Sequence, residues 1–486
     1  MACYEDLPEL DPHDLDDVPC IGVTCPLPLV DICATAIVPT VSAVEYALQN
    51  TPREVNFNLL RMAILNEHFD SIKYLLVNWP YTLLDFKCLL HGYSVVPFAK
   101  LFSGERNNLP TKLTSAIGDW LPEILKTSNI QCLDISCLDT DQEGTTKLAQ
   151  ASIDSLGIDV EEVELLVGQI LCHQVPFVSP PTGRTLQVNM CCTTDRYASE
   201  WHVFALVDAL TLRSLTPISL HCRGLIMTES DLPTVVKYVE PKMVSHLEID
   251  NCIDLPQIYN TVLSLYYLQS LDLPDFGDSP IDTLAAMLRS LPYLKRLNLM
   301  NTPLTSLVQR LLDGIQRPLE ELNLSNCRLE AADFEYLAKS HHTLALKHLD
   351  IGSQRLDLHF VAFIKFLKKI SERLVHLFLF DGHLSEGQII TLIDSCKFPV
   401  LRHWVLVGCK LYYHSYLNII MNLASLPRIQ HVSFSLPQGM QVANWTGPHE
   451  EWKEAANHFR EEIKMMVQDT CMTFDRPRFT VEIARF

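Results

Sequence analysis

Four histidines in the second half of the chain recur at an interval that a repeating fold would bring together. They lie 27 or 28 residues apart, each immediately before an apolar residue: His348, His376, His403 and His431. Imidazole nitrogens bind transition metals and titrate near neutral pH. Stacked in one column, they should oppose one another's protonation and lower the mean histidine pKa. We expect no carboxylate or thiol to complete a metal site in that column. Solvated polar side chains on an exposed sheet are the simpler interpretation.

Two phenylalanines lie close to this column. Phe378 and Phe380 follow His376 at alternate positions, so the three side chains share one face of a strand. An exposed patch that combines aromatic and imidazole rings is typical of a surface that binds another protein. We therefore predict that a partner binds the histidines and phenylalanines of the C-terminal half.

The sequence lacks the short motifs of common enzymes. It contains no G-x-x-x-x-G-K-[ST], G-x-G-x-x-G, H-E-x-x-H or G-x-S-x-G pattern. The pair His341-His342 is interpreted as solvated turn histidines, because no acidic residue follows at ligand spacing. We therefore predict a protein that is not an enzyme, with no catalytic residues, no cofactor and no bound metal.

The elements that position these residues belong to a repeat. The phrase L-x-x-L-x-L, or a looser version of it, occurs nine times at steps of 24 to 29 residues. Its alternating leucines indicate a short strand with one buried face, and the intervening segments have helical periodicity. Such units bury their apolar face only by stacking. The first positions of the copies are 215, 244, 268, 294, 319, 346, 374, 401 and 429.

This period predicts an α/β leucine-rich-repeat solenoid, a horseshoe with parallel strands inside and helices outside. Cys252, Cys327 and Cys409 each lie eight residues after the first position of a repeat, where this motif takes Asn or Cys. A zinc site is the alternative, but C-x-x-C pairs are lacking and the three lie on different repeats. We interpret them as core thiols.

Composition shifts suggest five segments. An acidic, disordered tail (1–24) precedes an N-terminal helical region (25–128). Divergent capping repeats with a loop insertion (129–214) begin with the strand Ile130-Leu133-Ile135 and precede the repeats proper (215–436). A C-terminal cap (437–486) contains Trp445, Trp452 and an amphipathic helix over 450–467.

Charge restricts the partners. The net charge of −20 repels phosphate backbones and anionic lipids, so we predict neither a nucleic-acid partner nor a membrane. The acidic N-terminus differs from a secretory or mitochondrial signal. We therefore expect a location in the cytoplasm or also the nucleus, with all 16 cysteines as reduced thiols.

Three phrases near the N-terminus resemble a known family. Thr51-Pro52-Arg53-Glu54-Val55, Leu59-Leu60 and Trp79-Pro80-Tyr81 resemble the start of the PRAME / leucine-rich repeat-containing protein 14 family. The resemblance spans roughly residues 28–470. It implies a substrate receptor of a cullin-2 RING ubiquitin ligase, with elongin B, elongin C and cullin-2 as partners. Some members are repressors of transcription or signalling, so an inhibitory scaffold without a ligase is the alternative.

The receptor role requires docking segments, and the resemblance implies two. Pro28, Leu29, Cys33 and Ile37 match an elongin-binding box, and the last three lie at i, i+4 and i+8 on one helix face. A core-facing amphipathic helix is the alternative interpretation.

Pro52 and Val55 match a cullin box. The family has an aliphatic residue before the proline, whereas this chain has Thr51, which is better suited to capping a helix. That departure leaves the choice of cullin open.

Overall fold

The computed structural model describes residues 29–90, 109–437, 440, 449–474 and 479–483, apart from short gaps at 139, 175, 177, 179–180, 182, 195–199, 251, 253 and 277–280. The described chain forms two compact units. The N-terminal unit contains residues 29–90, 109–191 and 200–221, and the repeat unit contains residues 192–194 and 222–483. No helix among the described residues is long and apolar enough to cross a bilayer. The predicted acidic tail, Pro28 and Trp445 lie outside the described residues.

The N-terminal unit begins with four helices. α1 packs on α3 and α2 packs on α4. These helices are α1 (Leu29–Ile37), α2 (Val41–Asn50), α3 (Val55–Leu65) and α4 (Phe69–Val77). The unit continues with β1 (Leu83–Asp85), α5 (Phe86–Leu90), α7 (Leu109–Thr127), β2 (Cys132–Asp134), α8 (Gln142–Asp154), α9 (Val160–Leu171), the first part of β3 (Leu186–Thr193), α10 (Glu200–Leu212) and the first part of β4 (Ile218–Thr228).

The strand predicted around Leu133 is β2, but it is not the first strand. β1 precedes it and pairs with it in parallel, and β2 pairs in parallel with β3. The central residues Leu84, Leu133 and Val188 face one another in register and are buried. The sequence did not predict β1 because the segment around Leu83–Asp85 lacks the L-x-x-L-x-L phrase, and a strand of three residues without it leaves almost no periodic signal.

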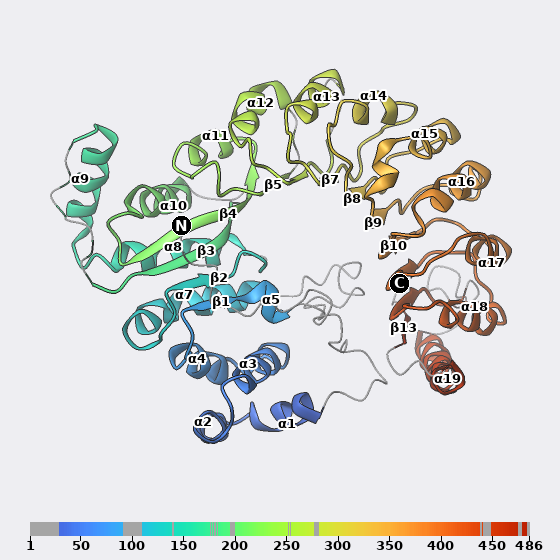
Figure 1. Ribbon diagram of the computed structural model, residues 1–486, viewed down its shortest axis with the longest axis horizontal. Coiled ribbons are helices and arrows are strands. Elements are labelled where there is room, and N and C mark those ends of the chain that lie inside the picture. Colours follow the sequence, from blue (N-terminus) through green and yellow to red (C-terminus); the bar gives the residue numbers. More distant parts are fainter. Residues whose placement is uncertain are drawn as a thin grey trace. The chain divides into compact units, whose positions relative to one another are not determined.

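The repeat unit is the predicted α/β leucine-rich-repeat solenoid. Within it, the strands line the inner side of an arc and the helices line the outer side (Figure 1). The strands pair in parallel in chain order. They are the second part of β4, then β5 (His246–Asp250), β6 (Ser270–Asp272), β7 (Arg296–Asn298), β8 (Glu321–Asn323), β9 (His348–Asp350), β10 (His376–Phe378), β11 (His403–Leu406), β12 (His431–Phe434) and β13 (Thr480–Ile483).

The outer helices of the repeat unit each bury one apolar side. In α16, Phe363, Phe366 and Leu367 are buried, whereas Lys368 and Lys369 are exposed. The helices are α11 (Leu232–Val235), α12 (Leu255–Ser264), α13 (Ile281–Arg289), α14 (Val308–Leu312), α15 (Ala331–Leu337), η2 (His341–Leu344), α16 (Phe360–Ile370), α17 (Glu386–Ser395), α18 (Ser415–Ala424) and α19 (His449–Phe474).

One buried residue in each strand of the repeat unit forms a continuous apolar column. Leu271, Leu297, Leu322, Leu349 and Leu377 are successive members in register, and each is at most 2% exposed. The first predicted repeat is out of register. Its first position, 215, would place Pro217 opposite His246, but the residue opposite His246 in the pairing of β4 with β5 is Gly224. β4 has eleven residues, and the L-x-L phrase in its first half hid the true partners in its second half.

The C-terminal end differs from the prediction in one respect. The predicted cap helix is present as α19, which packs against α18, with Phe459 meeting Tyr416 edge-on at 5.0 Å between ring centroids. However, the strand pattern does not end at residue 437, because β13 pairs with β12 in parallel. Thr480–Ile483 is separated from β12 by the long helix, so it falls outside the repeat period.

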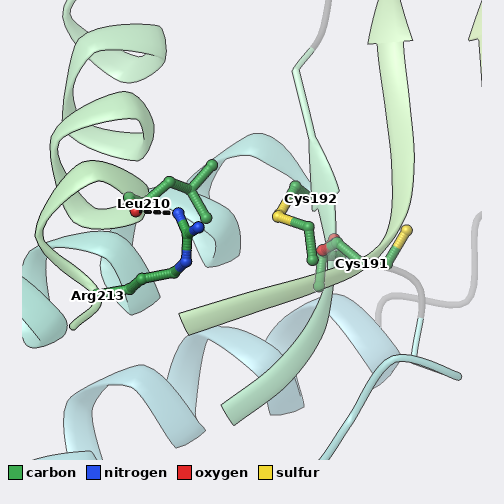
Figure 2. Close-up of a disulfide and its surroundings, with 6 residues drawn as sticks. Cys191, Cys192, Leu210 and Arg213 are labelled. Atoms are coloured by element: carbon green, nitrogen blue, oxygen red, sulfur yellow. Dashed lines mark hydrogen bonds between the residues drawn. A yellow bond between two sulfur atoms is a disulfide. The ribbon is translucent and has the colours of Figure 1, made fainter. Parts of the chain in front are cut away.

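Cysteines occupy the positions expected of core residues. Cys252, Cys327 and Cys409 are buried, and Cys327 Sγ donates a hydrogen bond to the carbonyl oxygen of Leu299 at 3.1 Å. This confirms the core interpretation. The expectation that every cysteine is a free thiol was wrong, because Cys192 of β3 and Cys222 of β4 form a disulfide (Figure 2). Thirty residues separate them in the chain, and a sequence alone does not reveal which thiols meet.

The apolar column predicts where substitutions destabilise the fold. Leu322→Ala should lower the free energy of unfolding by about 2–5 kcal/mol, because it removes buried methyl groups and leaves a cavity. Asn323 faces the other side of β8, but its Oδ1 accepts a hydrogen bond from Ser325 N at 2.9 Å. Asn323→Ala should therefore cost about 0.5–1.5 kcal/mol. Urea denaturation of both variants measures this difference, and equal losses would show that the two faces of the sheet are wrongly assigned.

Candidate functional site

The four predicted histidines form one stacked ladder on the inner face of the repeat unit. Strands β9 to β12 place His348, His376, His403 and His431 directly opposite one another. The ring centroids of His348 and His376 are 4.3 Å apart, and those of His376 and His403 are 4.5 Å apart, both with near-parallel planes. The last pair, His403 and His431, is looser at 5.9 Å. We call these four residues the histidine ladder.

The middle of the ladder is held neutral. Burial lowers the pKa of His376 to about 2, and the neighbouring His403 and His348 lower it further. Burial likewise lowers the pKa of His403 to about 3, with His431 and Arg402 adding to the effect. The pKa of His348 is also lowered, mainly by burial. The predicted direction is therefore correct, but desolvation rather than mutual repulsion is the larger cause.

Carboxylates stand at both ends of the ladder, contrary to the expectation of none. Glu321 of β8 occupies the next position in the column, with its Oε1 3.7 Å from His348 Nδ1. At the other end, Glu482 Oε2 lies 3.3 Å from His431 Nε2. His431 also contacts Thr480 Oγ1 at 3.0 Å and Ser433 Oγ at 2.9 Å. The two outer histidines are thus partnered by polar groups, while His376 and His403 stack mainly on each other and their neighbours.

The predicted apolar patch lies beside the ladder. Phe378 is half-buried in β10, and its ring lies parallel to that of His376 at 6.2 Å. Phe380, two residues on, is also half-buried. On β11 the position paired with Phe378 is Val405, which is fully buried. The surface beside the ladder is therefore aromatic and partly accessible, as a protein-binding surface requires.

The interpretation of His341 and His342 as solvated was wrong for one of them. His341 is exposed, but His342 is only 2% exposed. Its Nδ1 accepts a hydrogen bond from Leu319 N at 3.1 Å, and burial lowers its pKa to about 4. His342 is therefore a hydrogen-bonded core residue.

One group of described residues has the donor set of a metal site. His246 and Glu248 alternate along β5, and Asp272 faces Glu248 from β6. One ligand atom from each lies within 4.8 Å of the others. The sequence analysis missed this trio because it spans two strands and two columns of the sheet.

In the N-terminal unit, α1 presents the predicted elongin-docking residues outward. Leu29 is 75% exposed and Cys33 is an exposed free thiol, while Ile37 is half-buried. The opposite side of the helix carries the buried residues Asp31 and Ala34. The alternative of a core-facing helix is therefore wrong for Leu29 and Cys33.

The predicted cullin-docking residues lie between α2 and α3. Pro52 is exposed and Val55, the first residue of α3, is half-buried. Thr51 does not cap α3, whose N-cap is Glu54. Instead it follows the last turn of α2, where its Oγ1 donates to the carbonyl oxygen of Ala47 at 2.8 Å.

The phrase Trp79-Pro80-Tyr81 stabilises the fold of the N-terminal unit. Trp79 is buried, and its ring meets Phe57 edge-on at 5.1 Å and Tyr81 at 5.9 Å. Phe57 comes from α3, so this cluster fixes the segment after α4 against that helix. The residues that carry the resemblance thus include structural as well as exposed positions.

The histidine ladder predicts a pH-dependent stability. A histidine whose folded pKa is depressed stabilises the fold above its unfolded pKa of about 6.5, and that stability is lost as pH falls below it. His376 and His403 should each contribute at most about 1.4 kcal/mol per pH unit between about pH 6.5 and 4. The buried Asp350, with its pKa raised to about 6, has the opposite slope.

The test is chemical denaturation of the wild type and of the His376→Gln/His403→Gln variant at several pH values. The free energy of unfolding of the wild type should fall more steeply with acidification than that of the variant, in which Asp350 still titrates. Parallel curves for the two proteins would show that the ladder is not held neutral.

Comparison with known proteins identifies relatives of the same repeat class. No protein-family model matches the chain. Leucine-rich repeat-containing protein 14 of Xenopus laevis is 26% identical over 455 residues, covering 84% of this chain and 87% of the relative. The human protein of that name is 32% identical over 117 residues, 24% of each chain.

Among solved structures, the yeast Rad7 and Elc1 complex contains a chain that aligns at 18% identity with a TM-score of 0.39, covering 76% of this chain and 82% of that one. The sequence match confirms the resemblance that the N-terminal motifs predicted: the chain is a leucine-rich-repeat protein similar, over most of its length, to leucine-rich repeat-containing protein 14.

Proposed function

We propose that the protein is a substrate adaptor of a cullin-2 RING ubiquitin ligase, which docks elongin B and elongin C through α1 and holds a protein substrate on the inner face of the repeat unit. The leucine-rich-repeat fold supports protein binding in general. The family resemblance supports the ligase role, and the exposed face of α1 is the observation that carries it.

The exposed part of α1 is unusually apolar for a short helix at the surface. Besides Leu29, Val30 on one side of that residue is 46% exposed and Ile32 on the other side is 49% exposed. Three branched aliphatic side chains on one nine-residue helix leave apolar surface that a partner would remove from water at a gain of roughly 25 cal/mol per Å². Elongin docking uses a leucine and a cysteine one helical turn apart, which is the spacing of Leu29 and Cys33.

Contacts at the C-terminal end and on the buried side of α1 fix this helix within the N-terminal unit. Ser71 Oγ of α4 donates a hydrogen bond to the carbonyl oxygen of Val38 at 2.7 Å, which fixes the residue following α1. Buried Ala34 and Val38 pack the inner side against the rest of the unit. A docking face that is rigid before binding loses less conformational entropy on association.

The cullin contact is proposed at the next connection in the chain. Pro52 is exposed in the connection between α2 and α3, and α1 packs on α3. Both proposed docking segments thus belong to one small helical cluster. Thr51 forms its hydrogen bond within α2, so the side chains offered to a cullin from the predicted box are Pro52 and Val55.

The adaptor proposal predicts a loss of elongin without a loss of folding. Leu29→Ser/Cys33→Ser should abolish co-purification of elongin B and C from cells. Because both residues are exposed, the melting temperature should change little. The readout is quantitative mass spectrometry of affinity-purified protein, beside a thermal melt.

A matched control is available on another helix. Leu165 of α9 is 58% exposed, and Cys172 at the end of that helix is an exposed thiol. Leu165→Ser/Cys172→Ser should therefore leave elongin recovery unchanged. Undiminished elongin in the α1 variant would refute the docking helix. If wild type recovers no elongin at all, an inhibitory scaffold without a ligase becomes the better description.

A further inference from the structure

A groove lined by basic side chains runs along the start of β9, β10 and β11 in the repeat unit. Its cavity is about 470 Å³, and its cationic residues are Lys347, Arg373, Arg402 and Arg428. We call it the basic groove. No ladder histidine lines it. Lys347 and Arg402 each precede a ladder histidine by one residue, and successive side chains of a strand point to opposite faces of the sheet.

The strand register fixes the spacing of these charges. Val375 N donates to the carbonyl oxygen of Lys347, and Arg402 N donates to that of Val375, at 2.8 and 2.9 Å. These backbone groups are satisfied within the sheet. Neighbouring parallel strands lie about 4.8 Å apart, so Lys347 and Arg402 stand roughly 10 Å from each other. Arg373 and Arg428 reach the groove from the segments that follow α16 and α18.

The groove concentrates positive charge on a strongly acidic protein. Four cations line it against one carboxylate, Glu320, in a chain of net charge −20. Lys347 Nζ lies 3.0 Å from Glu320 Oε2 and so neutralises that carboxylate. Arg373 and Arg428 form no ion pair with any residue that the structure describes. Like charges gathered this closely repel one another unless an anion joins them.

The rest of the lining is aliphatic. Val375 and Val400 are half-buried, and Leu344 of η2 is 63% exposed. Nucleic acids have no aliphatic side chains to cover these residues, and the overall charge of the protein repels a long polyanion. A protein segment can supply both an anion and a neighbouring apolar side chain.

We propose that the basic groove binds a phosphorylated serine or threonine segment of a partner protein, with a leucine, isoleucine or valine beside the phosphate. Three of the four cations are arginines, whose planar guanidinium groups bind phosphate oxygens in bidentate pairs. A phosphate of charge near −2 neutralises two of them, whereas a carboxylate neutralises one. This inference rests on the proposed adaptor function, since it states which class of substrate the repeat unit recognises.

The test uses the full chain, purified together with whichever elongin it retains. The probes are degenerate dodecapeptide libraries labelled with fluorescein, with phosphoserine, serine or glutamate fixed at the centre, and an oligothymidylate of similar length. Fluorescence anisotropy measures binding at one salt concentration. Wild type should bind the phosphoserine library at least about tenfold more tightly than the serine library, with the glutamate library between them.

Variants locate the site. Arg373→Gln/Arg402→Gln should weaken binding of the phosphoserine library about tenfold or more, and the exposed Arg428→Gln alone should weaken it to a smaller extent. The matched control is Lys368→Gln/Lys369→Gln, which removes the same charge from exposed positions of α16 outside the groove and should have no effect. Elongin recovery should be equal in all of these proteins.

Three results would overturn the inference. They are equal binding of the serine and phosphoserine libraries, tighter binding of the oligothymidylate, and unchanged binding in both arginine variants. None of them bears on elongin docking by α1, which is measured separately in the same samples. Failure of the groove and failure of the adaptor role are therefore distinguishable.

Discussion

The structure of the repeat unit depends on the pairing of short parallel strands in strict register. A three-residue strand such as β8 forms few hydrogen bonds and buries one central side chain, Leu322, so it cannot be stable alone. Between β7 and β9, Leu322 lies in register with Leu297 and Leu349, and β8 pairs in parallel with both neighbouring strands. Each repeat is thus stabilised by its neighbours, and the energetic unit is the interface between repeats.

The same register sets the spacing of side chains on the inner surface. Residues at equal positions of successive repeats must lie about 4.8 Å apart, whatever their chemistry. In the C-terminal half, one column of the inner face carries the histidine ladder, and the column two residues further along the strands carries Phe378 and the buried Val405. Lys347 and Arg402 come one residue before the ladder, and successive side chains of a strand alternate between its two faces, so their charges are separate from the ladder.

The ladder differs from a simple row of solvated histidines. Because His376 and His403 are flanked by rings on both sides, water reaches them poorly, and the neutral imidazole is favoured over the imidazolium. Arg402, the residue before His403, opposes the protonation of both residues further. His376 and His403 therefore remain uncharged at neutral pH, and the positive charge of this region stays on the arginines and lysine of the basic groove.

The sequence alone determined the repeat unit, its strands β5 to β12, the core cysteines and the histidine column. Each of these follows from a period of 24 to 29 residues that repeats the same local preference many times. It also indicated the family resemblance and placed the proposed docking residues Leu29, Cys33 and Ile37 on one face of a helix.

Only the tertiary structure decided the contacts between residues that lie outside the repeat period. These are the pairing of β1 with β2, the pairing of β13 with β12, the Cys192–Cys222 disulfide and the burial of His342. It also decided that Leu29 and Cys33 face outward, and that Arg373 and Arg428 meet Lys347 and Arg402 in one groove. Periodicity records which positions are buried in a regular stack, but the contacts that close the ends, or that bring loop residues to a strand edge, depend on how the chain packs in space.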